Sequence, residues 1–339
     1  MSRKTTLIQI AEAAGVSLST VDRVLNRRGG VSPAVEAKVL EWANRLNLDR
    51  VSFRNYLKFL RVAVVMQSPQ NPFCKSLRDA FTDMNAVVSD MKINCFMHYI
   101  DVNNSAATAR KISQIAETYD ALIVICPDDP QLSDTLRLIS KRIPIVTLVT
   151  DLPDSGRIAY IGPDNRRAGR AAGELMGRFL GPDGGEILLI LGMQRMIGHE
   201  EREMGTRSVL RERFPCCTII DSLESGENQA RAAEVVYEAL RKNPGVRGIY
   251  NVSVGNSAIA KVIRSLGLEH KIILITHELT SEQRQMLREG ILDAVIDQNP
   301  QLEAQRALEV IGRYFERIEM GIQPEEYIPF NIFIRESCW

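Results

Sequence analysis

The sequence has few of the features that mark secreted, metal-bound or membrane proteins. Its six cysteines are scattered over 339 residues without a Cys-x-x-Cys pair, which argues against a zinc site or a disulfide framework and favours a reducing compartment. No apolar run approaches the ~18 residues of a membrane span. The segment 1–6 lacks the apolar core of a signal peptide, so we predict a cytoplasmic protein with no membrane partner.

Familiar catalytic signatures are also lacking. The chain contains no G-x-G-x-x-G, G-x-x-x-x-G-K-[ST], H-E-x-x-H or G-x-S-x-G motif. Its four histidines are too dispersed to predict a metal site. We therefore expect no cofactor, no metal ion and no catalytic residue. An α/β enzyme with an unfamiliar site is the alternative.

The chain has no net charge, because 42 basic residues balance 42 acidic ones, but the charges are unevenly placed. Residues 1–61 hold eleven bases and five acids, a net charge of +6, which leaves −6 for the rest. A basic segment on an acidic body is expected where one end of a protein meets nucleic-acid phosphate. DNA affinity should then reside in this segment and fall steeply with salt. A basic surface patch without a partner is the alternative.

Three short helices are predicted at the start of the chain. Thr6 and Gln9 have the spacing of a capping box, apolar residues follow at helical intervals, and Gly15 ends this first helix. Ser17 is expected to cap a second helix, and Pro33 to begin a third. Two short helices joined by a glycine-containing turn, then a third, predict a helix-turn-helix.

The exposed start of the second helix would meet the major groove. Leu18, Ser19, Asp22 and Arg23 lie there, and Arg23 is the one long donor able to bond guanine in bidentate fashion. A solvated arginine is the alternative interpretation.

The head resembles the lactose-repressor (LacI/GalR) family. Residues 7–17, 19–26 and 31–32 match the family pattern I-x-x-x-A-x-x-A-G-V-S-x-x-T-V-S-R-V-L-N with its later V-S. Asp22 departs from it, because the family usually has a serine that donates to a DNA phosphate and a carboxylate cannot. The resemblance implies DNA contacts from Thr6, Ser17, Leu18, Ser19, Thr20, Arg23, Asn26, Arg28 and Leu57.

Residues 49–60 occupy the place of the family's hinge helix. In the family this segment lies against the minor groove and wedges a leucine between base steps, and Leu57 falls at that position. Arg50 stands where proline is customary, and Arg54 where a small alanine lets paired hinges approach. A basic connector whose aromatic side chains pack on the body is the alternative.

From residue 61 the pattern changes to short β-rich runs that alternate with amphipathic helices. This alternation implies parallel sheets covered on both faces. Because about 275 residues exceed one small core, we predict an all-α head and an α/β body of two doubly wound parallel-sheet subdomains. The predicted strands are 62–66, 93–99, 121–126, 145–149, 186–191, 218–221, 248–252, 272–276 and 294–296, and helices include 75–88, 166–180, 229–241 and 302–321.

The body resembles the type I periplasmic sugar-binding proteins, especially their ribose-binding branch. The resemblance spans about residues 62–335 and rests on the stretches 64–73, 143–147, 162–169, 199–205, 276–280 and 296–300. It implies a cleft between two subdomains. The predicted organisation is a head of residues 1–48, a linker of 49–60 and a ligand-binding domain of 61–339, with subdomain one at 61–162 plus 298–325 and subdomain two at 163–297 plus 326–339.

In this family the matching loops face the cleft, and their side chains here suit a hydroxylated ligand. Phe73 can stack on a sugar ring, Arg202 offers a rigid fork of donors, and Glu278 accepts from hydroxyls. Such a set suits a neutral sugar or polyol better than a phosphorylated one. Each residue also has a structural alternative: Phe73 in the core, Asn71 as a turn cap, and Arg202 paired with Glu278. The predicted ligand residues are Asn71, Phe73, Asp151, Arg202, Ser253, Glu278 and Gln298.

These observations predict a transcription regulator, not an enzyme, whose affinity for double-stranded operator DNA is controlled by a sugar or polyol. We expect a homodimer on a pseudo-palindromic operator, because one recognition helix gives little discrimination, ~1–3 kcal/mol per bidentate contact. The alternatives are a transported-sugar receptor, a sugar-binding sensor whose head no longer binds DNA specifically, and an α/β enzyme.

Overall fold

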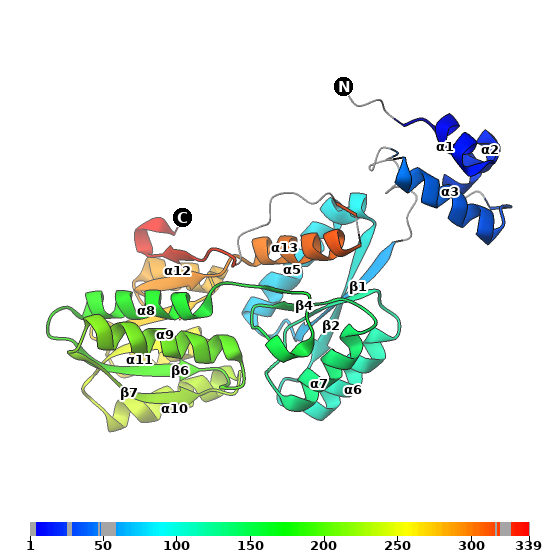
Figure 1. Cartoon of the computed structure of the whole chain (residues 1–339). Coiled ribbons are helices and arrows are strands. Elements are labelled where there is room, and N and C mark those ends of the chain that lie inside the picture. The colour runs from blue at the N-terminus through cyan, green and yellow to red at the C-terminus, as the bar shows by residue number, and fades with distance from the viewer. Residues whose placement is uncertain are drawn as a thin grey trace.

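The computed structural model describes residues 5–25, 29–46, 48, 59–315, 317–318 and 327–338. Three helices form the head, and an α/β body of two lobes follows (Figure 1). Across these residues, no helix combines the length and the apolar character needed to cross a membrane.

The three helices of the head begin and end where local signals predict. Thr6 and Gln9 form the capping box, and Gly15 ends the first helix with a left-handed φ of 64°. The Ser17 hydroxyl accepts the N–H of Thr20 at the start of the second helix. The helices are α1 (Leu7–Ala14), α2 (Leu18–Leu25) and α3 (Pro33–Arg45). Their apolar faces bury Ile10, Ala11, Ala14, Val21, Val24, Leu25, Val39 and Ala43, together with Leu48.

The first lobe is a five-stranded parallel sheet in the order β2-β1-β3-β4-β5, covered by α5 and α13 on one face and by α6 and α7 on the other. Successive residues of a strand point to opposite faces of the sheet, and both faces are apolar because helices cover each of them. The strands are β1 (Leu60–Gln67), β2 (Ile93–Ile100), β3 (Ala121–Val124), β4 (Ile145–Leu148) and β5 (Ala159–Ile161). The helices are α5 (Pro72–Val87), α6 (Ser105–Ala116), α7 (Pro130–Ser140) and α13 (Pro300–Tyr314), with short 3-10 turns at Val88–Met91 and Pro153–Ser155.

The second lobe is a six-stranded sheet in the order β11-β10-β9-β8-β6-β7, parallel except for the antiparallel pair β10 and β11. Helices α8 and α9 cover one face, and α10, α11 and α12 the other. The strands are β6 (Gly185–Leu191), β7 (Cys217–Glu224), β8 (Val246–Asn251), β9 (Ile273–His277), β10 (Ala294–Asp297) and β11 (Asn331–Phe333). The helices are α8 (Asn165–Leu180), α9 (Ile197–Arg213), α10 (Gln229–Lys242), α11 (Asn256–Ser265) and α12 (Ser281–Glu289), with a 3-10 turn at Arg335–Ser337.

The predicted fold class is confirmed, and every predicted strand is present within a few residues. The prediction missed β5 and β11, which at three residues each are too short to show an alternating pattern. The predicted helix 302–321 is wrong at its end. Helix α13 stops at Tyr314, and the N–H of Arg317 donates to the carbonyl of Gly312 instead of continuing the helical pattern.

The two lobes lie side by side (Figure 1). The chain passes from the first to the second after β5, returns to the first for α13, and ends in the second lobe with β11. In such sheets a ligand binds outside the carboxyl ends of the strands. The predicted hinge helix falls almost wholly on residues 49–58, which lie outside the described residues.

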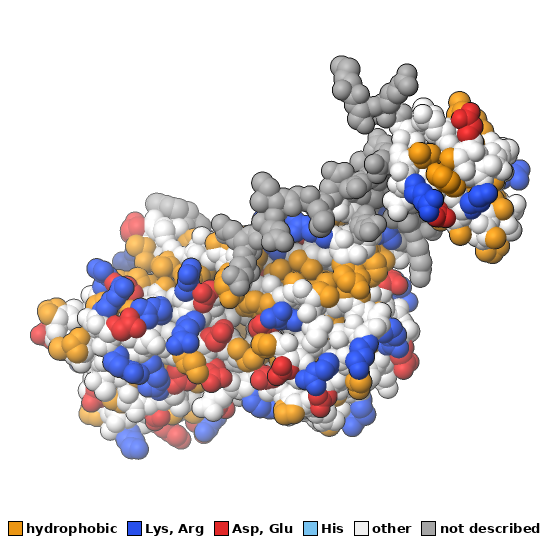
Figure 2. Space-filling view, viewed as in Figure 1, with side chains coloured by type: hydrophobic (Ala, Val, Ile, Leu, Met, Phe, Trp, Pro, Cys, Tyr) orange, Lys and Arg blue, Asp and Glu red, His pale blue; other side chains and the backbone are white. Residues whose placement is uncertain are grey.

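Charged side chains of both signs are interspersed over the visible face of the body (Figure 2). Many of them form surface ion pairs, such as Arg170 with Glu212 at 2.6 Å and Glu174 with Arg213 at 3.0 Å. Mixed surface charge of this kind favours solubility over attraction to phosphate.

Candidate ligand cavity and DNA-binding head

A cavity lies between the lobes, at the carboxyl ends of strands from both sheets. Its space, with the solvent of the open mouth included, is about 850 Å³. The lining comes from loops at the carboxyl ends of strands in both sheets, from helix α9 and from the first turns of α5, α10, α11 and α12. Six of the seven predicted ligand residues are in it: Asn71, Phe73, Arg202, Ser253, Glu278 and Gln298.

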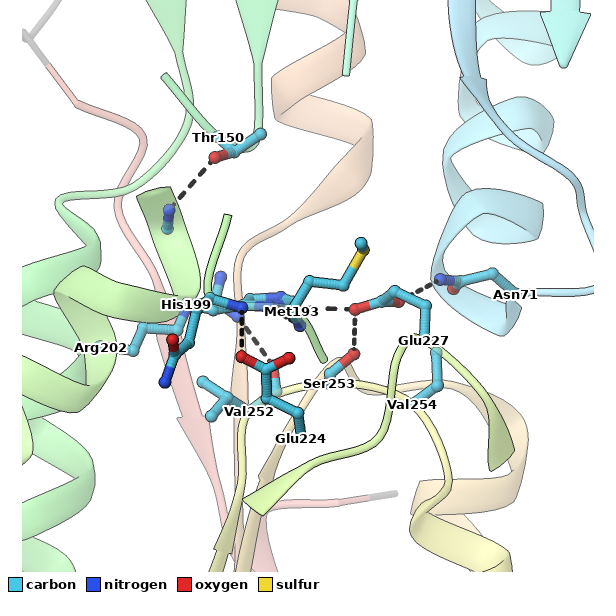
Figure 3. A network of polar contacts seen from close by, with 12 residues as sticks. Asn71, Thr150, Met193, His199, Arg202, Glu224, Glu227, Val252, Ser253 and Val254 are labelled. Atoms are coloured by element: carbon cyan, nitrogen blue, oxygen red, sulfur yellow. Dashed lines mark hydrogen bonds and ion pairs between the residues drawn. The ribbon is translucent and has the colours of Figure 1, made fainter. Parts of the chain in front are cut away.

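Asn71 caps a helix and also lines the cavity. Its Oδ1 caps α5 by accepting the N–H groups of Phe73 at 3.0 Å and Cys74 at 3.4 Å. This capping fixes the orientation of the amide, so Nδ2 faces across the cavity and donates to Glu227 Oε2 at 3.3 Å (Figure 3). Phe73 likewise lines the cavity while packing against the core of the first lobe.

Arg202 is the cationic centre of the cavity and is only 3 % exposed. Its Nε donates to Asn165 Oδ1 at 2.8 Å. Its Nη1 donates to the Val252 carbonyl at 3.2 Å (Figure 3). Gln298 stands between Arg202 and Glu278: its Oε1 accepts from Arg202 Nη2 at 3.2 Å, and its Nε2 donates to Glu278 Oε1. The arginine and the glutamate are thus joined through an amide rather than as a direct ion pair.

Glu278 retains an acceptor without a partner. Its Oε2 is buried, and no described residue forms a hydrogen bond with it. Burial raises the pKa of Glu278 to about 8, with a further upward contribution from Asp297, while Arg202 acts in the opposite direction. Near neutral pH this carboxyl holds a proton, so its partnerless oxygen can exchange a hydrogen bond with a ligand hydroxyl in either direction.

The stability of the protein should depend on pH through this carboxyl. A carboxyl whose pKa is raised in the folded state stabilises the fold below its ordinary pKa of 4.5, and this contribution is lost as the pH rises through about 8. We expect Glu278→Gln to gain in melting temperature relative to the wild type between pH 6 and pH 9. Differential scanning fluorimetry over this range, with the exposed Glu212→Gln as control, measures the effect. Parallel pH profiles for the wild type and Glu278→Gln would contradict it.

Glu227 is a cavity residue that sequence reasoning missed. It lies on the loop between β7 and α10, and its side chain is only 6 % exposed. Its Oε1 accepts from Ser253 Oγ at 2.6 Å (Figure 3). Burial raises its pKa, and hydrogen bonds from Ser253 and Gln67 oppose that shift. Its place just after a predicted strand is the signal that could have identified it, because ligands bind at such strand ends.

Residues with a strained, left-handed backbone conformation are concentrated beside the cavity. Among the described residues other than glycine, five have a positive φ, and four of these lie at strand ends beside the cavity. They are Val149 (68°), Glu227 (58°), Glu278 (68°) and Asn299 (60°). This conformation costs about 1–3 kcal/mol for such residues and is retained mainly where function needs it.

Asp151 does not line the cavity, in contrast to its prediction as a ligand residue. Its carboxylate pairs with Arg157, accepts from Thr147 Oγ1 at 2.9 Å and accepts the N–H of Leu152 at 2.7 Å. These partners saturate Asp151 inside the first lobe, so we leave it out of the proposed site. Its neighbour Thr150 lines the cavity instead.

The two lobes are in contact around the cavity. Thr150 Oγ1 accepts the N–H of Gly198 from the second lobe at 3.1 Å (Figure 3). Arg195 Nη1 lies 3.1 Å from Asp129 Oδ2, and the Arg195 carbonyl accepts the N–H of Asp128 at 2.7 Å. The structure therefore holds the lobes in a closed arrangement.

In the head, the described DNA-binding candidates lie at the start of α1 and along α2, with Arg23 in the last turn of α2. Thr6, Ser17, Leu18, Ser19 and Arg23 are exposed, and Thr20 is half-buried. A shallow groove is lined by Thr6, Leu7, Ile8, Leu18, Ser19 and Asp22. The predicted contacts Asn26, Arg28 and Leu57 lie outside the described residues.

Two family models match the chain, one for each part. Residues 6–49 match the bacterial regulatory proteins of the lacI family, and residues 62–317 match the periplasmic binding protein domain. The chain is a lacI-family regulator with a periplasmic binding protein domain. The lacI-family regulator is thus a DNA-binding protein rather than an enzyme, and its curated relatives are binding proteins and a regulator.

The lacI-family regulator has known relatives whose sequence identity to it is low. The HTH-type transcriptional regulator DegA of Bacillus subtilis (strain 168) is 26 % identical over 67 % of this chain and 68 % of its own. The ribose import binding protein RbsB of Salmonella typhimurium is 20 % identical over 74 % of this chain and 83 % of its own. The D-allose-binding periplasmic protein of Escherichia coli (strain K12) is 23 % identical over 42 % of this chain. The chain spans only 46 % of the length of that relative.

Among solved structures, a solute binding protein from Burkholderia graminis in complex with D-arabinose has the fold of the body. It superposes with a TM-score of 0.74 at 21 % identity and covers 82 % of this chain and 96 % of its own. At this identity the likeness establishes the fold alone.

Proposed function

We propose that this lacI-family regulator controls transcription in response to a hydroxylated small molecule, a sugar or a polyol, that binds between the lobes. The observation that carries the proposal is the polar cavity centred on the buried Arg202, on the same chain as a helix-turn-helix head. Arg202, Gln298 and Asn71 supply donors, and Glu278 supplies a buried free acceptor. Relatives named for ribose and allose binding support this class of ligand.

The ligand would act by stabilising the closed arrangement of the lobes. It fills the space between loops of both lobes and adds contacts to those already present, such as Asn71 with Glu227. A ligand shifts an equilibrium only by its differential affinity for the two states. A cavity lined from both lobes provides that difference, because in an open arrangement a ligand can contact one lobe but not both.

For DNA binding, the proposed form of the protein is a homodimer whose two heads bind a pseudo-palindromic operator. Pairing two recognition helices doubles the base contacts that α2 can make. The cytoplasmic location predicted from sequence agrees with this role and stays a prediction.

The first test of the ligand is a thermal-shift screen of monosaccharides and polyols on the full chain. A bound ligand raises the melting temperature by mass action. A shift that Gln298→Ala removes, while Glu212→Gln keeps it, supports the cavity as the binding site. A screen without any shift would count against the proposed ligand class.

Replacing Arg23 by alanine should weaken specific DNA binding far more than non-specific binding. Arg23 is the long exposed donor on α2, and loss of one bidentate base contact costs about 1–3 kcal/mol, or roughly 5- to 150-fold in affinity. Gel shifts with the upstream region of the protein's own gene and with scrambled DNA measure the two affinities.

The matched control is Arg45→Ala, on the exposed end of α3. This change should reduce binding to both DNAs about equally, if at all. An equal loss on both DNAs for Arg23→Ala would make Arg23 a phosphate contact. Absence of any specific shift, with or without sugars, would overturn the regulator proposal.

A further inference from the structure

We propose that the ligand of this cavity is a hydroxylated amine, such as an amino sugar or an amino polyol, whose ammonium group binds Glu227. The inference rests on the proposed ligand cavity and narrows the class of ligand. It follows from the surroundings of Glu227, a buried carboxylate that faces the cavity without a cationic partner.

Burial raises the pKa of Glu227, and the hydrogen bonds that its carboxyl accepts act against that shift. Ser253 Oγ donates to Oε1 at 2.6 Å, and Asn71 Nδ2 donates to Oε2 at 3.3 Å. The amide of Asn71 cannot turn round, because its Oδ1 is held by the N–H groups that begin α5. Each oxygen of the carboxylate thus receives a hydrogen bond, and donors to a carboxylate stabilise its ionised form.

None of the described basic side chains neutralises this charge at close range. His199 Nδ1 lies 3.8 Å from Glu227 Oε1, but it accepts the N–H of Met193, so the ring proton is on Nε2. Burial lowers the pKa of His199 to about 3, which keeps the ring neutral at physiological pH. Arg202 is committed to Asn165, Val252 and Gln298.

The charge balance of the whole lining points in the same direction. Its acidic residues are Glu227, Glu278 and the exposed Glu282, and its basic residues are Arg202, His199 and His277. Burial raises the pKa of Glu278 to about 8 and keeps this carboxyl protonated near neutral pH, so the negative charge of the lining falls to Glu227 and Glu282. His277 is buried with its Nε2 against the Tyr250 hydroxyl at 2.5 Å, and burial lowers its pKa well below the ordinary value. Arg202 is therefore the one charged cation among these lining residues.

A buried carboxylate without a counter-ion is costly, and a ligand ammonium would remove that cost. Glu227 is the place for it, because its two oxygens already have neutral donors and lack only a positive charge. Glu278 and Gln298 then remain for hydroxyl groups of the same ligand. A phosphate or carboxylate on the ligand would face like charge in this lining.

The test compares matched pairs of probes that differ in one group. We would titrate the full chain by calorimetry with glucosamine and glucose, galactosamine and galactose, and glucamine and sorbitol. In at least one pair the amine should bind about tenfold or more tightly than its hydroxyl parent, as close charge pairs do. If, in every pair that binds, the hydroxyl compound binds as tightly as its amine, the amine proposal is overturned. The hydroxylated-ligand proposal would still stand. Absence of binding by all six probes would overturn both.

Glu227→Gln isolates the charge, because glutamine keeps the shape and an acceptor oxygen. This variant should lose the preference for the amine while its affinity for the hydroxyl parent changes by about twofold or less. Glu212→Gln, which removes an equal charge from the exposed pair with Arg170, should keep the wild-type preference. An unchanged preference in Glu227→Gln would place the ammonium elsewhere and refute the assignment.

Discussion

Replacing Arg202 by alanine is expected to abolish ligand-induced thermal stabilisation and to lower the free energy of unfolding by about 3 kcal/mol or more. Arg202 is 3 % exposed and donates to three acceptors, on Asn165, Val252 and Gln298. Truncation leaves these acceptors buried without donors. It also removes the cation that holds Gln298 against Glu278, so a ligand would meet a disordered set of acceptors.

Thermal shift with a ligand from the screen and urea unfolding without ligand measure the two effects. Arg207→Ala is the matched control, because Arg207 lies on the same helix but is partly exposed and pairs with Glu203. It should cost about 1 kcal/mol or less and keep the ligand shift. If Arg202→Ala proves too unstable, Arg202→Met fills most of the volume and should still lose the ligand shift. Retained stabilisation by ligand in either variant would remove Arg202 from the binding site.

The second large effect is expected at the contact between α8 and α9. A Cβ added at Gly169 would lie 2.0 Å from the carbonyl oxygen of Arg202, and one at Gly205 would lie 2.1 Å from that of Arg166. Both obstacles are backbone atoms, so the helices would have to separate. Gly169→Ala should therefore destabilise the protein by about 3 kcal/mol or more, although alanine favours helix formation.

Urea unfolding followed by circular dichroism measures this loss. Arg167→Ala, at an exposed position near the start of the same helix, is the control and should lie within about 0.5 kcal/mol of the wild type. Because α9 carries Arg202, Gly169→Ala should also weaken ligand binding. A variant as stable as the wild type would show that the two helices can separate without cost.

Much of the fold follows from local signals in the sequence. Thr6 with Gln9, Gly15 and Ser17 set the ends of the helices of the head, because caps act within a few residues. Inner strands of the body such as β3 show uninterrupted apolar runs, because helices cover both faces of each sheet. Strand ends converge in parallel sheets, so loop residues such as Asn71 and Glu278 could be placed at one cavity.

Other features arise only from contacts between distant segments. Asn71 and Glu227 lie 156 residues apart in sequence, and only the closed lobes bring them together. Asp151 has a carboxylate that could bind a ligand, but in the folded chain this carboxylate forms an ion pair with Arg157.

The sequence by itself therefore determined the helices of the head, the alternating body and the polar loops at the strand ends, because caps and apolar periods act locally. The tertiary structure alone decided which of these loops meet, how α8 and α9 pack through glycine, and that Glu227 stays buried without a counter-ion. Burial and charge balance are properties of the assembled lobes, since each depends on atoms that separate stretches of chain contribute.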